Sequence, residues 1–169
     1  QLLEELNKSL GRVFAYQAPF VNQSESDHLE MAVLTLSPEK RPPQLALANR
    51  PALLLHPEGR EELITHTAGA VGCPPETKAP AYQARFVEME EGDTLCLFSN
   101  GFVDQLGGTA ENQEDSALGQ DAFVKLLKEV SGTPAGQRRQ VALKRAFQAW
   151  KGEREQTDDI SILMLTQLS

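Results

Sequence analysis

The feature that most restricts the fold is a short, mostly apolar run near the middle of the chain, closed at both ends by turn residues. The run extends from Thr94 to Ser99, after the turn pair Gly92-Asp93 and before Asn100-Gly101. A run of this length and composition, bounded by turns, predicts a strand. A second apolar run, Ile160 to Leu165, predicts a buried strand late in the sequence. The fold must therefore include at least these two apolar strands.

Periodic patterns predict the other elements. Apolar residues at helical spacing predict amphipathic helices at residues 2–13, at about Asp121 to Val130 and at about Ala135 to Trp150. Alternating or β-branched residues predict further strands, expected at Met31 to Leu36, Gln44 to Ala48, Ala52 to Leu55, Glu62 to His66 and Tyr82 to Glu88. We expect the strands between residues 31 and 66 to form a β-meander and the polar residues 107–120 to form an exposed loop.

Length and charge limit the class of protein. The 169 residues, 40% hydrophobic and 24% charged, are typical of one globular domain with a single core. The net charge of −8 argues against nucleic acid or an anionic membrane as a partner, because both would repel the chain. No apolar run approaches the ~20 residues of a membrane span, and the first residues lack the basic start of a signal peptide. We therefore expect a cytoplasmic location.

Cysteine and histidine residues give no sign of a site. Cys73 and Cys96 lie in separate segments without a close C-x-x-C pair, so neither a zinc site nor a disulfide framework is expected. The histidines His28, His56 and His66 have no partner at i, i+4 spacing, and we expect all three at the surface.

Two polar corners follow or precede the apolar runs and could carry chemistry. They are Ser99-Asn100-Gly101 and Asp158-Asp159-Ile160-Ser161. Adjacent carboxylates repel one another, and a divalent cation with oxygen ligands would relieve that repulsion. The alternative is a solvated turn, which is the commoner role of an Asp-Asp pair when it is considered alone.

The order of the motifs adds further information. The relevant segments are Leu6-Asn7, Met31 to Leu36, Ala48-Asn49-Arg50-Pro51, Gly92 to Gly101, Leu118-Gly119 and Asp158-Asp159-Ile160-Ser161. This series resembles that of SpoIIE-like, PPM-type metal-dependent serine/threonine phosphatases, which show an L-N helix, a strand ending in T, A-N-A-G-H-P-P, G-D-x-L-x-L-Y-T-D-G, F-G and D-D-I-T. The resemblance runs through nearly the whole chain.

The resemblance implies a fold and a chemistry. The family fold is α+β, an antiparallel β-sandwich flanked by helices in an α-β-β-α arrangement, with Mn²⁺ or Mg²⁺ at one end of the sheets. Family members use a metal-activated water to hydrolyse phosphoserine or phosphothreonine directly. A phosphorylated regulatory protein is then the expected partner, as in the partner-switching circuits that relatives serve.

Carried over residue by residue, the resemblance assigns the site as follows. Asp158 matches the terminal metal-binding aspartate, and Asp159 is its neighbour, expected to support the ligand or the local structure. Asn100, followed by Gly101, stands where the family has the aspartate of T-D-G, and a neutral amide there should lower metal affinity. Asp104 stands where relatives often have a glutamate, and it is expected either to support the site or to be an ordinary loop acid.

Two features depart from the family pattern. Arg50 replaces the A-G-H part of its segment, and the family's first aspartate, within D-x-x-G-H-G, precedes the L-N helix at which residue 1 already lies. We therefore expect one phosphatase-like domain over residues 1–169 that lacks the N-terminal strands. Open sheet edges would then favour a homodimer.

Three functions remain open at this level. The first is a phosphatase whose missing metal ligands are supplied elsewhere, and the second is a catalytically inactive phosphatase-like module that binds a regulatory protein. The third is an unrelated α+β binding domain in which the Asp-Asp pair is only a turn.

Overall fold

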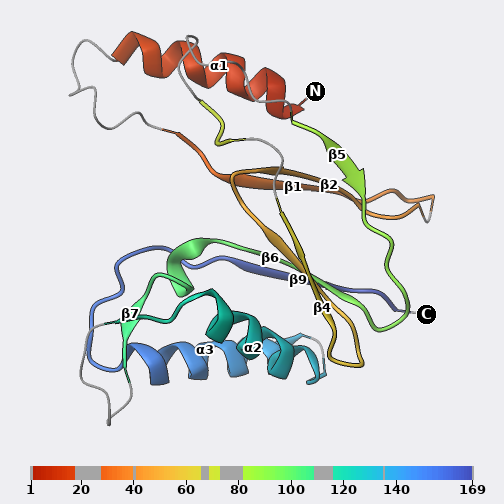
Figure 1. Ribbon diagram of the computed structural model, residues 1–169, viewed down its shortest axis with the longest axis vertical. Coiled ribbons are helices and arrows are strands. Elements are labelled where there is room, and N and C mark those ends of the chain that lie inside the picture. The colour runs from red at the N-terminus through yellow and green to blue at the C-terminus, as the bar shows by residue number, and fades with distance from the viewer. Residues whose placement is uncertain are drawn as a thin grey trace. The chain divides into compact units, whose positions relative to one another are not determined.

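The computed structural model describes residues 2–17, 28–39, 41–65, 69–72, 82–108, 116–134 and 136–168. The chain divides into two compact units. The first unit comprises Gln1–Ala52 and Leu63–Met89, and the second comprises Leu53–Glu62 and Glu90–Ser169. Figure 1 shows the elements of both.

The first unit combines a helix with a three-stranded antiparallel sheet. Its elements are α1 (Leu2–Gln17), β1 (Met31–Thr35), β2 (Gln44–Ala48) and β5 (Ala84–Phe86). The strand order is β1-β2-β5, and the β1–β2 register runs from Met31 opposite Ala48 to Thr35 opposite Gln44. The amphipathic pattern of α1 places Leu3 in a small core with Ala48, Val71 and Tyr82, which stabilises the helix by apolar burial.

The second unit holds two long helices and most of a four-stranded sheet. Its strands follow the order β4-β3-β6-β9 and are β3 (Ala52–Leu55), β4 (Glu61–Ile64), β6 (Thr94–Phe98) and β9 (Ile162–Thr166). The helices are α2 (Gln120–Ser131) and α3 (Gln137–Lys151), with a short 3-10 helix, η2 (Asn100–Phe102), directly after β6. A small antiparallel pair joins β7 (Leu106–Gly107) to β8 (Ser116–Ala117).

Aromatic packing joins the sheet of the second unit to its helices. The rings of Phe98 and Phe123 lie 5.0 Å apart edge to face, and Phe102 contacts both Phe123 and Phe147 at 5.3 and 5.0 Å. These phenylalanines come from β6, η2, α2 and α3, so one cluster fixes four elements. In Figure 1, α2 and α3 lie together along one side of the β6–β9 pair. The residues after β6 are thereby placed on a rigid base.

Most predicted elements are confirmed, and the fold is α+β, with antiparallel sheets and, in the described part of the chain, three α-helices. The β-meander is wrong, because β2 and β3 belong to different sheets. The chain leaves the first sheet at Asn49, whose φ of 48° lies in the left-handed region that asparagine tolerates, and Pro51 follows. That change of direction ends the pairing that a meander would have continued.

The predicted loop at 107–120 is also partly wrong, since its ends pair as β7 and β8. Gly107 allows β7 to lie close to the end of α3, because a Cβ there would lie 2.3 Å from the Trp150 carbonyl oxygen. The predictions for Cys73 and His66 fall outside the described residues.

Candidate functional site

The two predicted polar corners meet where β6 ends and β9 begins. The β6–β9 register ends with Phe98 opposite Ile162, and Ser99 continues the contact beyond it. The Ser99 amide donates to the Ser161 carbonyl oxygen at 2.9 Å, and the Ser161 amide donates to Ser99 Oγ at 2.9 Å. Ser99 Oγ in turn donates to the Asp159 carbonyl oxygen at 3.1 Å. Segments about 60 residues apart in the sequence are thus held side by side.

Gly101 makes this approach possible. It is buried within η2, and a Cβ built on it would lie 2.4 Å from the Asp159 carbonyl oxygen and 3.1 Å from Ile160 Cγ1. Any side chain at this position would push the Asp-Asp segment away from β6. The glycine of the T-D-G-like motif therefore has a steric role in this chain.

The side chains of the candidate site are mostly exposed. Asp158 Oδ1 accepts a hydrogen bond from the Asp159 amide at 2.7 Å, and the Asp158 carbonyl oxygen accepts one from Gln156 Nε2 at 2.9 Å. The Asn100 side chain donates through Nδ2 to Asp104 Oδ2 at 2.7 Å, and the Asp104 amide donates to the Asn100 carbonyl oxygen at 2.9 Å. The structure therefore joins Asn100 to Asp104 directly.

The chemistry of these residues can be compared with what a cation site requires. Within the described ranges, no group of three or more His, Cys, Asp and Glu side chains is arranged to hold a metal ion. Asn100 is a neutral amide whose NH₂ group faces Asp104, whereas the family motif has a carboxylate at this position. Asp158 is exposed, and carboxylate oxygens are ligands that Mn²⁺ and Mg²⁺ prefer. Its chemistry therefore fits that of one ligand in such a site. Further oxygen ligands would be required.

Arg50, which replaces the A-G-H part of the family segment, lies in the first unit. Its Nη2 donates to Glu30 Oε2, and Asn49 Nδ2 donates to the other oxygen of the same carboxylate. The Glu30 carboxylate therefore holds the turn at which the chain leaves the first sheet.

Gln105 holds the backbone that leads to the Asp-Asp segment, and it is not among the predicted site residues. Its side chain is fully buried, and Nε2 donates at 2.9 Å to the carbonyl oxygens of Leu106 and Glu155. Trp150 Nε1 donates to the Gln105 carbonyl oxygen at 2.8 Å. Because Glu155 lies three positions before Asp158, Gln105 anchors the approach to the candidate site. A lone glutamine in a polar stretch has no pattern that would reveal this role.

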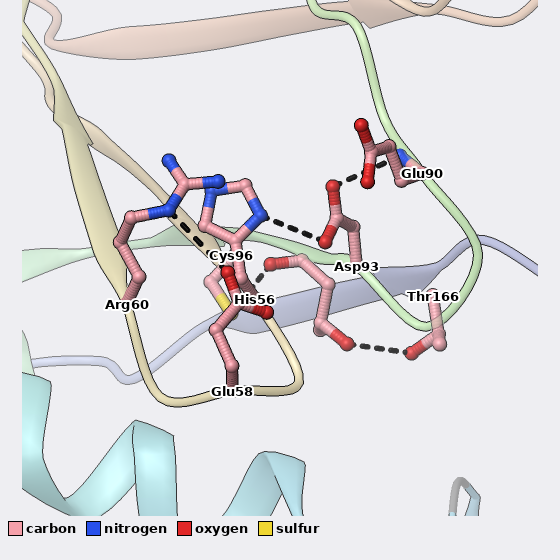
Figure 2. Close-up of polar contacts among 8 residues, drawn as sticks. His56, Glu58, Arg60, Glu90, Asp93, Cys96 and Thr166 are labelled. Carbon is pink, nitrogen blue, oxygen red and sulfur yellow. Dashed lines mark hydrogen bonds and ion pairs between the residues drawn. The ribbon is translucent and has the colours of Figure 1, made fainter.

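A second polar cluster lies at the opposite end of β6. His56 Nδ1 and Asp93 Oδ1 are 2.8 Å apart, and the Glu90 amide donates to Asp93 Oδ2 at 2.9 Å (Figure 2). The His56 and Asp93 side chains are 9% and 3% exposed, so the prediction of His56 at the surface is wrong. Among the described residues His56 Nε2 has no hydrogen-bond partner. Asp93 directly precedes β6, which separates this pair from Ser99 by the length of the strand.

Cys96 lies at the centre of β6 and is not part of either cluster. Its side chain is fully buried, and burial raises the pKa of the thiol to about 12, against a smaller lowering by the Arg139 charge. Such a thiol is protonated and unreactive at neutral pH.

Comparisons with known proteins address the family. The family model for stage II sporulation protein E, SpoIIE, matches residues 1–167. No significant match was found among curated protein sequences.

Solved structures show the same fold. The SiaA-PP2C domain of Pseudomonas aeruginosa superposes with a TM-score of 0.70 at 17% identity, over 98% of this chain and 68% of that one. The PPM Ser-Thr phosphatase MsPP from Mycobacterium smegmatis gives 0.59 at 14% identity, covering 99% and 73%. The SpoIIE phosphatase domain from Bacillus subtilis gives 0.54 at 10% identity, covering 99% and 72%.

Sequence and fold therefore agree. The motif series that ends in Asp-Asp-Ile-Ser, the family match over nearly the full length and the α+β fold of the solved neighbours lead to one assignment. The chain belongs to the SpoIIE family of PPM-type, PP2C-like phosphatase domains.

Proposed function

We propose that the chain is the C-terminal part of a SpoIIE-like serine/threonine phosphatase domain that acts on a phosphorylated regulatory protein. The observation that supports this most directly is the contact between Ser99 and residues 159–161, which brings both family motifs to one end of the β6–β9 pair. In this proposal Asp158 is a ligand for Mn²⁺ or Mg²⁺. Further carboxylate ligands would be needed to complete the site.

The chain's own residues would have distinct parts in such a site. Asp158 would bind the cation, while Asp159 supplies the backbone atoms that hold Asp158 in place. Asp104 would add negative charge beside Asn100. A bound cation of this kind supplies a water of lowered pKa and neutralises charge on phosphate oxygens. A regulatory substrate agrees with the description of the related Bacillus subtilis protein as a determinant of cell fate.

The second candidate is a phosphatase-like module without catalysis that binds a regulatory protein. The hydrogen bond between Asn100 and Asp104 favours it, because the two side chains at the T-D-G-like corner partly satisfy each other. Replacing the aspartate by asparagine removes one negative charge from a site that must attract a dication. Metal affinity separates the two candidates.

Calorimetric titration with Mn²⁺ tests the proposal. We expect weak or undetectable binding by the unmodified chain and roughly tenfold tighter binding by Asn100→Asp, because the change adds a carboxylate at the corner that contacts the Asp-Asp segment. Adding Asp158→Ala should abolish that gain. The control is Glu91→Ala in the Asn100→Asp background, which removes an exposed acid near the opposite end of β6 and should leave the affinity unchanged.

The outcomes are distinct. Affinity that survives Asp158→Ala would show that Asp158 is not a ligand, and the proposal would fail. A chain whose Asn100→Asp variant still binds no Mn²⁺ would support the non-catalytic module.

A further inference from the structure

Ser99 directly follows β6 and stands at the N-cap of η2, where a serine ordinarily uses its hydroxyl to cap the helix. Here the hydroxyl makes no capping hydrogen bond. Instead it accepts from the Ser161 amide at 2.9 Å and donates to the Asp159 carbonyl oxygen at 3.1 Å. The hydroxyl therefore binds the backbone of the facing segment and does not cap η2.

The Asp159 carbonyl oxygen is fixed from two sides. Ser99 Oγ attracts it by a hydrogen bond, and Gly101 leaves the space that it occupies, since a Cβ there would lie 2.4 Å away. The Asp159 amide is bonded to Asp158 Oδ1 at 2.7 Å. The Asp158 carboxylate is thus oriented by the peptide unit between residues 158 and 159. Ser99 holds the next peptide unit, which carries the Asp159 carbonyl oxygen.

We propose that Ser99 is a positioning residue. Its hydroxyl fixes the orientation of the Asp158 carboxylate by holding the backbone of residues 159–161 against the end of β6. The inference rests on the proposed function, because a set orientation of Asp158 matters only if Asp158 binds a cation. Ser99 itself need not contact the metal or the substrate. Without the hydroxyl, the Ser161 amide and the Asp159 carbonyl group would form hydrogen bonds with water instead, and the Asp158 carboxylate would lose its fixed orientation.

The chain offers a matched control on the same two strands. Thr94 and Thr166 form the register pair at the other end of β6 and β9, and their hydroxyls lie 3.0 Å apart. Thr94→Val removes a hydroxyl that links these strands, as Ser99→Ala does, but it does so away from the Asp-Asp segment. Ser99→Thr keeps the hydroxyl and serves as the conservative rescue.

Amide hydrogen exchange followed by NMR tests the positioning without any metal. We expect the Ser161 amide to exchange roughly tenfold faster in Ser99→Ala, because its acceptor is lost. Exchange should return to near the original rate in Ser99→Thr and stay unchanged in Thr94→Val. Unchanged exchange in Ser99→Ala, or an equal rise in Thr94→Val, would overturn the inference. If Ser99→Ala does not fold, Ser99→Cys, which keeps the size but bonds weakly, replaces it.

Mn²⁺ titration then separates positioning from simple stabilisation. In the Asn100→Asp background, Ser99→Ala should weaken Mn²⁺ binding several-fold, Ser99→Thr should restore it and Thr94→Val should not change it. Faster Ser161 exchange with unchanged affinity would reduce Ser99 to a structural role and overturn the inference. If Asn100→Asp binds no Mn²⁺ in any variant, the proposed function fails, and the exchange rates alone decide whether Ser99 holds the segment.

Discussion

Gly101 shows how strongly a single residue can limit the candidate site. Its neighbour in space is a backbone carbonyl oxygen, which cannot rotate away as the end of a side chain could. The β6 end and the Asp-Asp segment must therefore separate if any other residue is placed there. The geometry of the site depends on the absence of a side chain as much as on the carboxylates.

We predict that Gly101→Ala destabilises the fold by ~1–3 kcal/mol, the range for inserting a methyl group into a closely packed position. The measurement is urea unfolding followed by circular dichroism. Gly132→Ala is the control, because Gly132 has a φ of −68° and a Cβ there would meet its nearest atom at an ordinary 3.6 Å. Equal unfolding midpoints for the two variants would contradict the close contact at Gly101.

Cys96 gives the fold a pH dependence at alkaline pH. The pKa of its thiol is about 12 in the folded chain, above the ordinary value of 9.0, because burial disfavours the thiolate. Between these values the unfolded chain loses a proton that the folded chain keeps, so stability falls as pH rises, by at most ~1.4 kcal/mol per pH unit. Below the ordinary pKa the contribution is fully present.

The corresponding prediction concerns Cys96→Ala. Between about pH 8 and about pH 10.5, the urea midpoint of the unmodified chain should decline more steeply than that of the variant, which lacks the Cys96 thiol proton. The comparison cancels the titration of tyrosines and lysines, which both proteins share. Parallel declines would show that the thiol ionises as easily in the folded state as in the unfolded one.

At the scale of elements, the phenylalanine cluster holds β6, η2, α2 and α3 together. Phe123 is fully buried and contacts both Phe98 and Phe102. We predict that Phe123→Ala costs ~3–5 kcal/mol, the usual effect of removing a large core side chain. Phe86 is 58% exposed, so Phe86→Ala should change stability far less. Denaturant unfolding measures both, and similar losses would argue against this cluster as the core of the second unit.

The apolar runs could be predicted from the sequence because each has its own local pattern. β6 and β9 were expected at 94–99 and 160–165, and they are found at Thr94–Phe98 and Ile162–Thr166. The family motifs also located Asn100, Gly101 and Asp158. That the two corners touch through Ser99 had no local signal, because the contact joins residues 60 positions apart.

Other features were missed for the same reason. The sequence predicts His56 at the surface because its partner Asp93 lies 37 positions later, and no local pattern indicates that contact. The β-meander failed because the choice of sheet for β3 is decided by pairing with β6, which local β-propensity cannot show. Gln105 is held by the backbone of Glu155, again a distant contact.

For the whole molecule, family and activity are separate matters. The family is shown by the match over residues 1–167, while no group of three or more His, Cys, Asp and Glu side chains among the described residues is arranged to hold a metal ion. Among the described residues no helix is both long and apolar enough to span a bilayer. Because the family assignment does not establish activity, activity has to be measured on this chain.

We predict that the chain hydrolyses a generic aryl phosphate at a rate near background in Mn²⁺, and that Asn100→Asp alone does not restore turnover. One added carboxylate cannot replace the remaining ligands that a two-cation mechanism requires. The assay is release of the aryl alcohol over time, with Asp158→Ala as the reference for contaminating phosphatases. Robust Mn²⁺-dependent turnover that Asp158→Ala abolishes would show that this chain has a complete centre.

The long sequence separation between the two corners also bears on the order in which the chain folds. We expect α2 and α3, which lie between Ser99 and Asp159 in the sequence and have local contacts, to form before β9 pairs with β6. Closing so long a loop costs conformational entropy that only the completed ladder offsets. The candidate site is therefore expected to arise late in folding, so a collapsed chain that already contains its helices would still lack it.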